Sequence, residues 1–157
     1  MTIEENIVQI LTQCKAEIQA NMASKGINAS GRTSAAFKVE QTADSIALVL
    51  DRSGRVAPLE TLEIGRPAGK VPRGFYYIIK QWTHEKNLPF NNETARQRFA
   101  YFTARKIADK GTKRHKQHIN VYSMPVQKAR KSIEESVNFF VSSMIKQATN
   151  NFSNGRE

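Results

Sequence analysis

The segment from residue 60 to 72 most constrains the fold, because no regular helix or strand can run through it. It reads Glu-Thr-Leu-Glu-Ile-Gly-Arg-Pro-Ala-Gly-Lys-Val-Pro. Glycine allows positive φ and proline fixes φ, so this stretch must turn. Proteins tend to keep contact residues in surface loops of this kind. We therefore predict that it contacts a neighbouring subunit or a partner protein through Glu63, Arg66, Lys70 and Arg73.

Arg66 is the residue of this loop with the most specific chemistry. Its planar guanidinium can bind a carboxylate through two parallel hydrogen bonds. We predict that Arg66 pairs with a carboxylate of its own chain or of a neighbour.

The first third of the chain predicts a helix followed by a β-hairpin. Apolar residues recur at spacings of three and four from Ile3 to Met22, which predicts an amphipathic helix that ends near Gly26. Residues 28–33 are predicted to form a loop. Two strands are then predicted at 37–41 and 46–50, and the second, apolar on both faces, is expected to be the more buried.

The remaining two thirds predict three more helices. One spans residues 74–86, and the next spans 93–110, where Gly111 is a natural left-handed stop. A short extended piece follows at 119–122, and Pro125 suits the first turn of a long last helix. The packing side of the helix at 93–110 is predicted to hold Ala95, Phe99, Phe102 and Ile107. The stripe of the last helix is predicted to hold Ala129, Ile133, Val137, Phe140, Val141, Met144 and Ile145.

These elements predict one α+β domain over residues 1–150 and a flexible tail at 151–157. The domain would have a small antiparallel sheet, made of the hairpin plus a short extra strand, packed against about four helices. The length of 157 residues suits a single domain with its own core. No apolar run approaches the roughly 18 residues of a membrane span, and the acidic N-terminus is unlike a signal peptide. We therefore expect no membrane contact and synthesis in the cytoplasm.

The sequence offers no recognisable catalytic or metal site. Gly65, Gly69 and Lys70 resemble a phosphate-binding loop only superficially, because the spacing is one residue short and Val71 replaces the required Ser or Thr. The histidines of the segment 115–118 have no further Cys or His to complete a tetrahedral site. The one cysteine, Cys14, excludes an internal disulfide and lies on an apolar helix stripe, which predicts a buried structural thiol. We expect no enzyme activity and no cofactor.

Positive charge is concentrated in one stretch of the chain. The net charge is +10, and residues 105–131 hold nine Lys or Arg against one acid, Asp109, which leaves +8 there. Such a field attracts polyanions in a salt-dependent way, although it can equally be a solvated face that keeps the protein in solution. Lys113, Arg114 and Lys116 are predicted to face DNA or an acidic partner.

Several short motifs occur in a definite order along the chain. They are Ser30-Gly31-Arg32-Thr33, Leu62-Glu63-Ile64-Gly65-Arg66-Pro67 with Gly69 and Pro72, Ile79-x-x-Trp82 with Lys86-Asn87, Phe99-Ala100-x-x-x-Ala104-Arg105-Lys106-Ile107, and Gly111-Thr112. In this order and spacing they resemble the tail-completion, or head–tail connector, family of tailed double-stranded DNA phages. The likeness covers roughly residues 28–145. The aromatic and proline segment usual in that family after Gly-Thr is here the basic stretch from Lys113 to His118.

The resemblance implies a structural virion protein rather than an enzyme. In that family a hairpin-centred sheet packs on helices, and the subunits assemble into a ring between portal and tail, around the DNA channel. It implies a cyclic homo-oligomer of twelve-fold or, alternatively, six-fold symmetry, with portal, tail or other neck proteins as neighbours. DNA in the channel would be contacted without sequence specificity.

Two rival functions come from other classes. The first is a free basic nucleic-acid-binding phage protein that uses residues 113–131 on phosphate, although Tyr122 is the one aromatic in that stretch that could stack on a base. The second is a phage enzyme or host-takeover factor, for which the sequence offers no site. A connector subunit would be present in purified virions at a fixed multiple of the portal, and the rivals would not.

Overall fold

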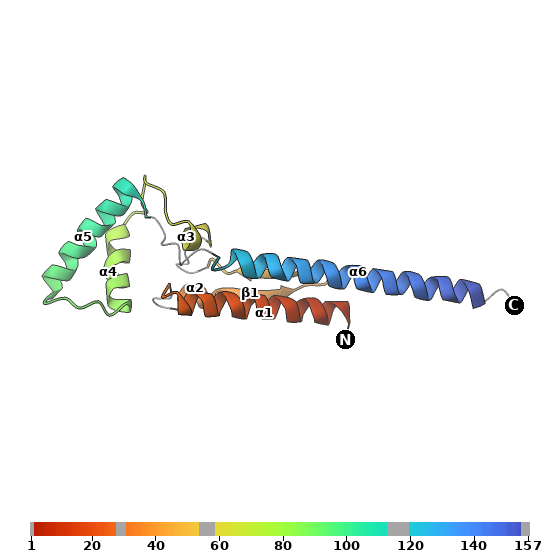
Figure 1. Cartoon of the computed structure of the whole chain (residues 1–157). Helices are drawn as coiled ribbons and strands as arrows, with labels where there is room; N and C mark the ends of the chain where they lie inside the picture. The colour runs from red at the N-terminus through yellow and green to blue at the C-terminus, as the bar shows by residue number, and fades with distance from the viewer. Residues whose placement is uncertain (1, 28–30, 54–58, 113–119, 155–157) are drawn as a thin grey trace.

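The computed structural model of the chain describes residues 2–27, 31–53, 59–112 and 120–154. These residues form an elongated α+β fold, in which two long antiparallel helices lie side by side and a helical hairpin sits at one end (Figure 1). In chain order the elements are α1 (Ile3–Ser24), α2 (Arg32–Ala35), β1 (Phe37–Gln41), β2 (Ile46–Leu50), α3 (Leu59–Glu63), α4 (Phe75–Glu85), α5 (Glu93–Lys110) and α6 (Ser123–Asn154). The predicted class, with its long C-terminal helix, is confirmed.

Helix α1 begins with a capping box. The Thr2 hydroxyl accepts a hydrogen bond from the backbone N–H of Glu5 at 3.2 Å, and the Glu5 carboxylate accepts one from the N–H of Thr2 at 2.8 Å. Two backbone donors at the helix start are thereby satisfied. The helix ends at Ser24, and Gly26 follows with φ of 62°, close to the predicted end.

The hairpin has the predicted strands. β1 and β2 pair antiparallel, with Phe37 opposite Leu50, and they form the whole sheet within the described residues. All of β2 is half-buried, whereas β1 buries Phe37 and exposes most of the rest, so the second strand is the more evenly covered. Arg32 and Thr33 belong to the short helix α2 rather than to a loop.

The main core lies where α1 meets the hairpin, α3 and the start of α6. Its buried members are Cys14, Ile18, Met22, Phe37, Leu62, Val121 and Ala129. Ile18 is 1% exposed and Met22 is 1% exposed, so the predicted stripe of α1 is the one that packs. Removing this apolar surface from water is the main favourable term for folding the body.

A second, smaller core joins α4 to α5. Ile79 of α4 packs against Ala100 and Ala104 of α5, which are 0% and 8% exposed. Alanine has no bulk beyond Cβ, so the two helices can pack closely along this line. The predicted packing side of α5 was therefore partly wrong, because Phe99 and Phe102 are 40% and 65% exposed.

The segment that enters α6 also differs from expectation. Asn120 to Tyr122 form a turn, with Asn120 at φ of 64°, where a short extra strand had been predicted; residue 119 lies outside the described residues. Val121 is fully buried there, so the turn serves as a core anchor. At the other end, α6 continues to Asn154, into the segment predicted as a tail.

Candidate functional site

The punctuated loop begins at a firmly anchored point. Leu62 of α3 is 2% exposed and belongs to the main core. The next residue, Glu63, is half-buried, and its Oε1 accepts hydrogen bonds from the backbone N–H of Tyr122 at 2.7 Å and of Ser123 at 2.9 Å. A carboxylate at this place satisfies orphan N–H groups at the start of α6 and complements the positive end of the helix dipole.

This capping role of Glu63 is one that sequence reasoning missed. The prediction was a contact with a neighbouring subunit or partner, but Oε1 is engaged inside the chain. Capping signals are normally read from residues next to the helix start, whereas Glu63 is 59 residues before Tyr122. No local pattern could have identified it.

The middle of the loop crosses the end of α5. The N–H of Arg66 donates to the Thr112 hydroxyl at 2.9 Å, and the carbonyl of Arg66 accepts from the N–H of Thr112 at 2.7 Å. The N–H of Gly69 donates to the carbonyl of Ala108 at 2.8 Å. Two of the motifs found in the sequence, around Arg66 and around Thr112, are thus bonded to each other.

Gly111 makes this crossing possible. A Cβ at this position would lie 2.3 Å from the Arg66 carbonyl oxygen and 2.8 Å from the backbone nitrogen of Ala68. The residue caps α5, as predicted, with φ of 69° but ψ of −167°, which is outside the left-handed helical region. Only glycine adopts this conformation readily, and only glycine leaves room for the loop.

The Arg66 side chain folds back on its own loop. Nη2 donates to the Lys70 carbonyl at 2.8 Å, and the guanidinium carbon lies 5.4 Å from the centre of the Phe75 ring. None of the ion pairs in the described part of the chain involves Arg66. Pairing with a carboxylate of a neighbour stays a prediction. Lys70 and Arg73 are exposed, so the tip of the loop is free for contact while its base is fixed.

The three basic residues predicted to face DNA or an acidic partner, Lys113, Arg114 and Lys116, lie outside the described residues. The described helix just before them does carry exposed cations. Arg98, Arg105 and Lys106 are all exposed on α5. Part of the predicted basic surface is therefore on a helix.

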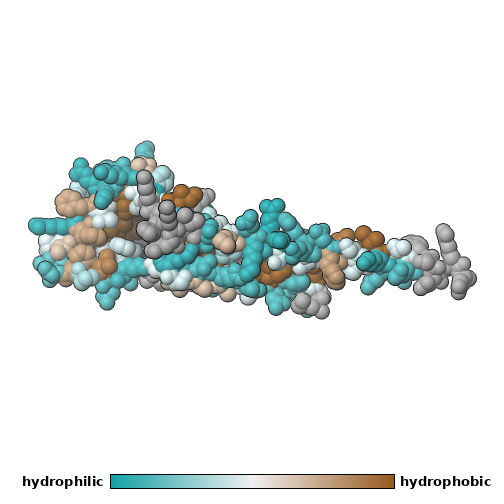
Figure 2. Space-filling view, viewed as in Figure 1, coloured by the Kyte–Doolittle hydropathy of each residue, from teal (hydrophilic) through white to brown (hydrophobic). Residues whose placement is uncertain are grey.

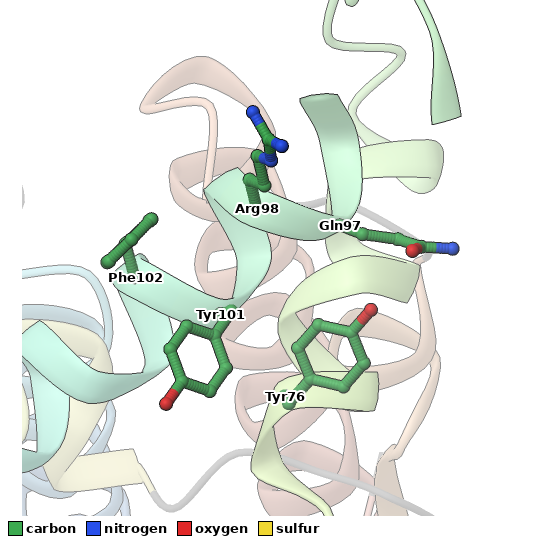
Figure 3. Close-up of a pocket in the computed structure, with 5 residues that line it drawn as sticks. All are labelled: Tyr76, Gln97, Arg98, Tyr101 and Phe102. Atoms are coloured by element: carbon green, nitrogen blue, oxygen red, sulfur yellow. The ribbon is translucent and has the colours of Figure 1, made fainter. Parts of the chain in front are cut away.

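An open hollow lies beside these cations, between α4 and α5 (Figure 3). Its volume is about 490 Å³, and it is lined by Tyr76, Gln97, Arg98, Tyr101 and Phe102. Tyr101 and Phe102 meet edge to face, with ring centres 5.6 Å apart, and are 53% and 65% exposed. The sequence analysis missed this hollow because it had placed Phe102 on the packing side of α5.

A second exposed apolar surface lies on α6, at the opposite end of the molecule. We call it the α6 stripe: Val137, Phe140, Val141, Met144 and Ile145. Their exposed fractions rise along the helix from 38% at Val137 to 61% at Ile145. Asn6, near the start of α1, donates to Ser136 of α6 at 3.3 Å, so the N-terminal end of α1 lies close to where the stripe begins. Figures 1 and 2 show this part of α6 projecting past α1, with apolar residues on its surface.

Reactive groups are scarce in the part of the chain that the structure describes. Cys14 is 4% exposed, and burial raises the pKa of its thiol, so the nucleophilic thiolate is disfavoured. The predicted buried position of Cys14 is confirmed. Across the same residues, no group of three or more His, Cys, Asp or Glu could hold a metal ion, and no helix is long and apolar enough to cross a membrane.

The α4–α5 hairpin carries its own charge pairing. Lys80 of α4 contacts Glu93 of α5 at 2.7 Å, and this hydrogen bond lowers the pKa of the Glu93 carboxyl. Arg32 of α2 pairs with Glu85 of α4 at 2.9 Å, and Lys86 donates to the Gly26 carbonyl. These contacts tie the hairpin to the body.

Comparison with known proteins finds no matching family model, no matching curated protein and no matching solved structure.

Proposed function

We propose that this chain is a structural subunit of the neck of a tailed phage, where its copies form a closed ring around the DNA channel between portal and tail. The observation that carries the proposal is the pair of unpartnered apolar surfaces at opposite ends of an elongated subunit. One is the hollow of α4 and α5, and the other is the α6 stripe.

Surfaces at opposite ends suit a ring. A head-to-tail interface joins two different patches, and repeated rotation by the same angle closes a circle of copies. A two-fold dimer would instead use one patch twice. Contiguous exposed apolar surface generally marks a protein-binding region, and both of these surfaces lie within the described residues.

The internal bonding of the loop also supports the proposal. The motifs that resemble the connector family meet in space, since Arg66 and Thr112 exchange two hydrogen bonds and Glu63 caps α6. The loop therefore has a fixed base and an exposed tip at Pro67 to Lys70. A fixed element with an exposed tip suits contact with a neighbouring subunit, because little conformational entropy is lost when it docks.

The charge of the chain fits a position next to DNA. The net charge is +10, and Arg98, Arg105 and Lys106 are exposed on α5. Copied around a ring, such residues give a positive field that contacts phosphate without reading bases. The same field would also bind an acidic neighbouring ring.

The composition of purified particles tests the proposal. Mass spectrometry of intact virions of the phage that encodes this chain should detect it at a fixed multiple of the portal protein. Native mass spectrometry of the assembled form should give a closed oligomer of twelve or, alternatively, six copies. Purified particles that lack the chain would contradict the proposal.

A free nucleic-acid-binding protein is the second candidate function, and one observation favours it. Tyr101 and Phe102 are exposed beside Arg98, and single-stranded nucleic acids bind surfaces that combine stacking rings with positive charge. Affinity for single-stranded DNA would then fall steeply with salt and would drop on Tyr101→Ser or Phe102→Ser. The chain would be absent from purified particles.

A further inference from the structure

We propose that the α6 stripe of one copy docks into the hollow between α4 and α5 of a second copy. This inference rests on the proposed ring and names the two surfaces that would join its subunits. It assigns one occupant to the hollow and one to the α6 stripe.

The α6 stripe has the form of a helix that binds a groove. Val137, Phe140, Val141, Met144 and Ile145 follow the spacing i, i+3, i+4, i+7 and i+8, so they share one face. Apolar anchors at this spacing are what a groove-binding helix presents. α6 has 32 residues and α1 has 22, a difference of about 15 Å in length at 1.5 Å per residue. α1 is thus too short to cover the stripe.

The hollow has the lining expected of a receiving surface. The Tyr76 and Tyr101 rings lie on facing sides of the space between the two helices, whereas the Arg98 and Gln97 side chains extend away from it (Figure 3). Tyrosine and arginine are enriched among residues that dominate binding energy at protein interfaces. The hollow is open rather than enclosed, so the face of a helix could lie across it.

Charge does not prevent a second copy from occupying the hollow. The chain carries +10, so copies repel each other over most of their surface. From residue 137 to 154 the only charged residue is Lys146, so this segment can approach a basic surface with little repulsion. It also includes the C-terminal end of α6, where the helix dipole is negative and unsatisfied carbonyls favour cations within about one turn.

The geometry favours head-to-tail docking over pairing of two stripes. Both surfaces lie on one chain but at opposite ends, so they cannot meet within a subunit (Figure 1). If two α6 stripes paired with each other, the hollow would stay open in both copies. Docking of the stripe into the hollow covers both surfaces at once and leaves each copy able to bind the next.

Cross-linking of the full chain tests which surfaces meet. Gln97→Cys places a thiol in the hollow and Ala148→Cys places one beside the stripe, while the native Cys14 is buried and unreactive in the parent control. We expect a short bis-maleimide to join the two variants when they are mixed and to leave each alone largely unlinked. Efficient linking within Ala148→Cys alone would overturn the proposal in favour of stripe-to-stripe pairing.

Matched substitutions supply the energetic test. Phe140→Ser should weaken self-association by about tenfold or more, as loss of a buried anchor does, measured by sedimentation or mass photometry. Phe139→Ser is the control, because Phe139 is 79% exposed and lies off the stripe. Tyr101→Ser should weaken association comparably, and the double variant Phe140→Ser/Tyr101→Ser should lose less than the sum of the two single losses.

The remaining outcomes separate this inference from the proposed function. If Phe140→Ser and Tyr101→Ser form closed rings at the same concentration as the parent, the docking is wrong and the ring still stands. A parent chain that stays monomeric even when concentrated would overturn the docking, and particle composition would then judge the neck function independently. If single-stranded DNA blocks labelling of Gln97→Cys while association is unchanged, the hollow is a nucleic-acid surface and the docking is wrong.

Discussion

The two halves of α6 carry the same kind of apolar stripe, yet only the first half is covered. Ala129 is 7% exposed against α1, whereas Ile145 is 61% exposed beyond it. The change comes at the N-terminal end of α1, near the contact of Asn6 with Ser136. Periodicity thus predicts which face of a helix is apolar, but the length of the partner helix decides how much of that face is buried inside the subunit.

A matched pair of isoleucines gives the largest expected contrast. Ile18→Ala removes a side chain that is 1% exposed in the main core, and we expect a loss of about 2–5 kcal/mol in the free energy of unfolding. Ile145→Ala removes one that is 61% exposed, and we expect a change within about 0.5 kcal/mol. Urea unfolding at low protein concentration measures both. An equal loss in the two variants would show that the α6 stripe is packed within a single subunit.

Two glycines test the junction between the body and the α4–α5 hairpin. Gly111→Ala combines positive φ with a Cβ placed 2.3 Å from a backbone oxygen, whereas Gly26→Ala has similar φ and nothing within 4 Å. We expect Gly26→Ala to cost about 1–2 kcal/mol through strain alone. Gly111→Ala should cost about 1–3 kcal/mol more, because the Arg66 segment must move.

Hydrogen exchange locates that effect. The amides of Gly69 and Thr112 donate across the junction, so both should lose protection in Gly111→Ala and keep it in Gly26→Ala. Equal unfolding costs for the two glycine variants would mean that the loop does not hold the end of α5.

Substitution of Glu63 tests how the N-terminus of α6 is capped. Glu63→Ala leaves the N–H groups of Tyr122 and Ser123 without their acceptor, and we expect a loss of about 1–2 kcal/mol. Glu134→Ala is the control, since it removes an exposed partner of Arg130 on the same helix and should change stability by less than about 0.5 kcal/mol. Chemical denaturation measures both, and a loss no larger in Glu63→Ala than in Glu134→Ala would exclude the capping role.

Much of the fold could be predicted from the sequence because its signals are local. The limits of the strands follow from alternation in the first, an apolar run in the second and the turn residues between them, and the end of α5 follows from the stop at Gly111. α1 likewise begins at a capping box.

The parts that could not be predicted depend on residues far apart in the chain. Phe102 lies on an apolar-looking side of α5, but Ala100 and Ala104 allow the closer approach to α4 and therefore face it. Glu63 caps a helix that begins 60 residues later. The candidate contact loop was recognised from its glycines and prolines. The exposed apolar surfaces at the two ends of the molecule could not be predicted in this way, because their exposure depends on the lengths of the helices that pack beside them.

The smallest expected effect comes from the hairpin that covers α1, where Lys38 of β1 contacts Asp51 at 2.6 Å. The hydrogen bond from Lys38, together with one from the N–H of Ser53, lowers the pKa of the Asp51 carboxyl well below its ordinary value. A carboxyl whose pKa is lowered on folding stabilises the protein above its unfolded pKa of about 3.9 and stops doing so as pH falls through the folded value. The melting temperature of Asp51→Asn should therefore lie slightly below that of the parent at pH 7, and the gap should narrow as the pH falls below 4. Added salt should also narrow it, since the pair is partly exposed. Asp44→Asn, in the exposed hairpin turn, is the control. If the difference in melting temperature between Asp51→Asn and the parent stays unchanged at the lowest pH, the charge of this pair is not its cause.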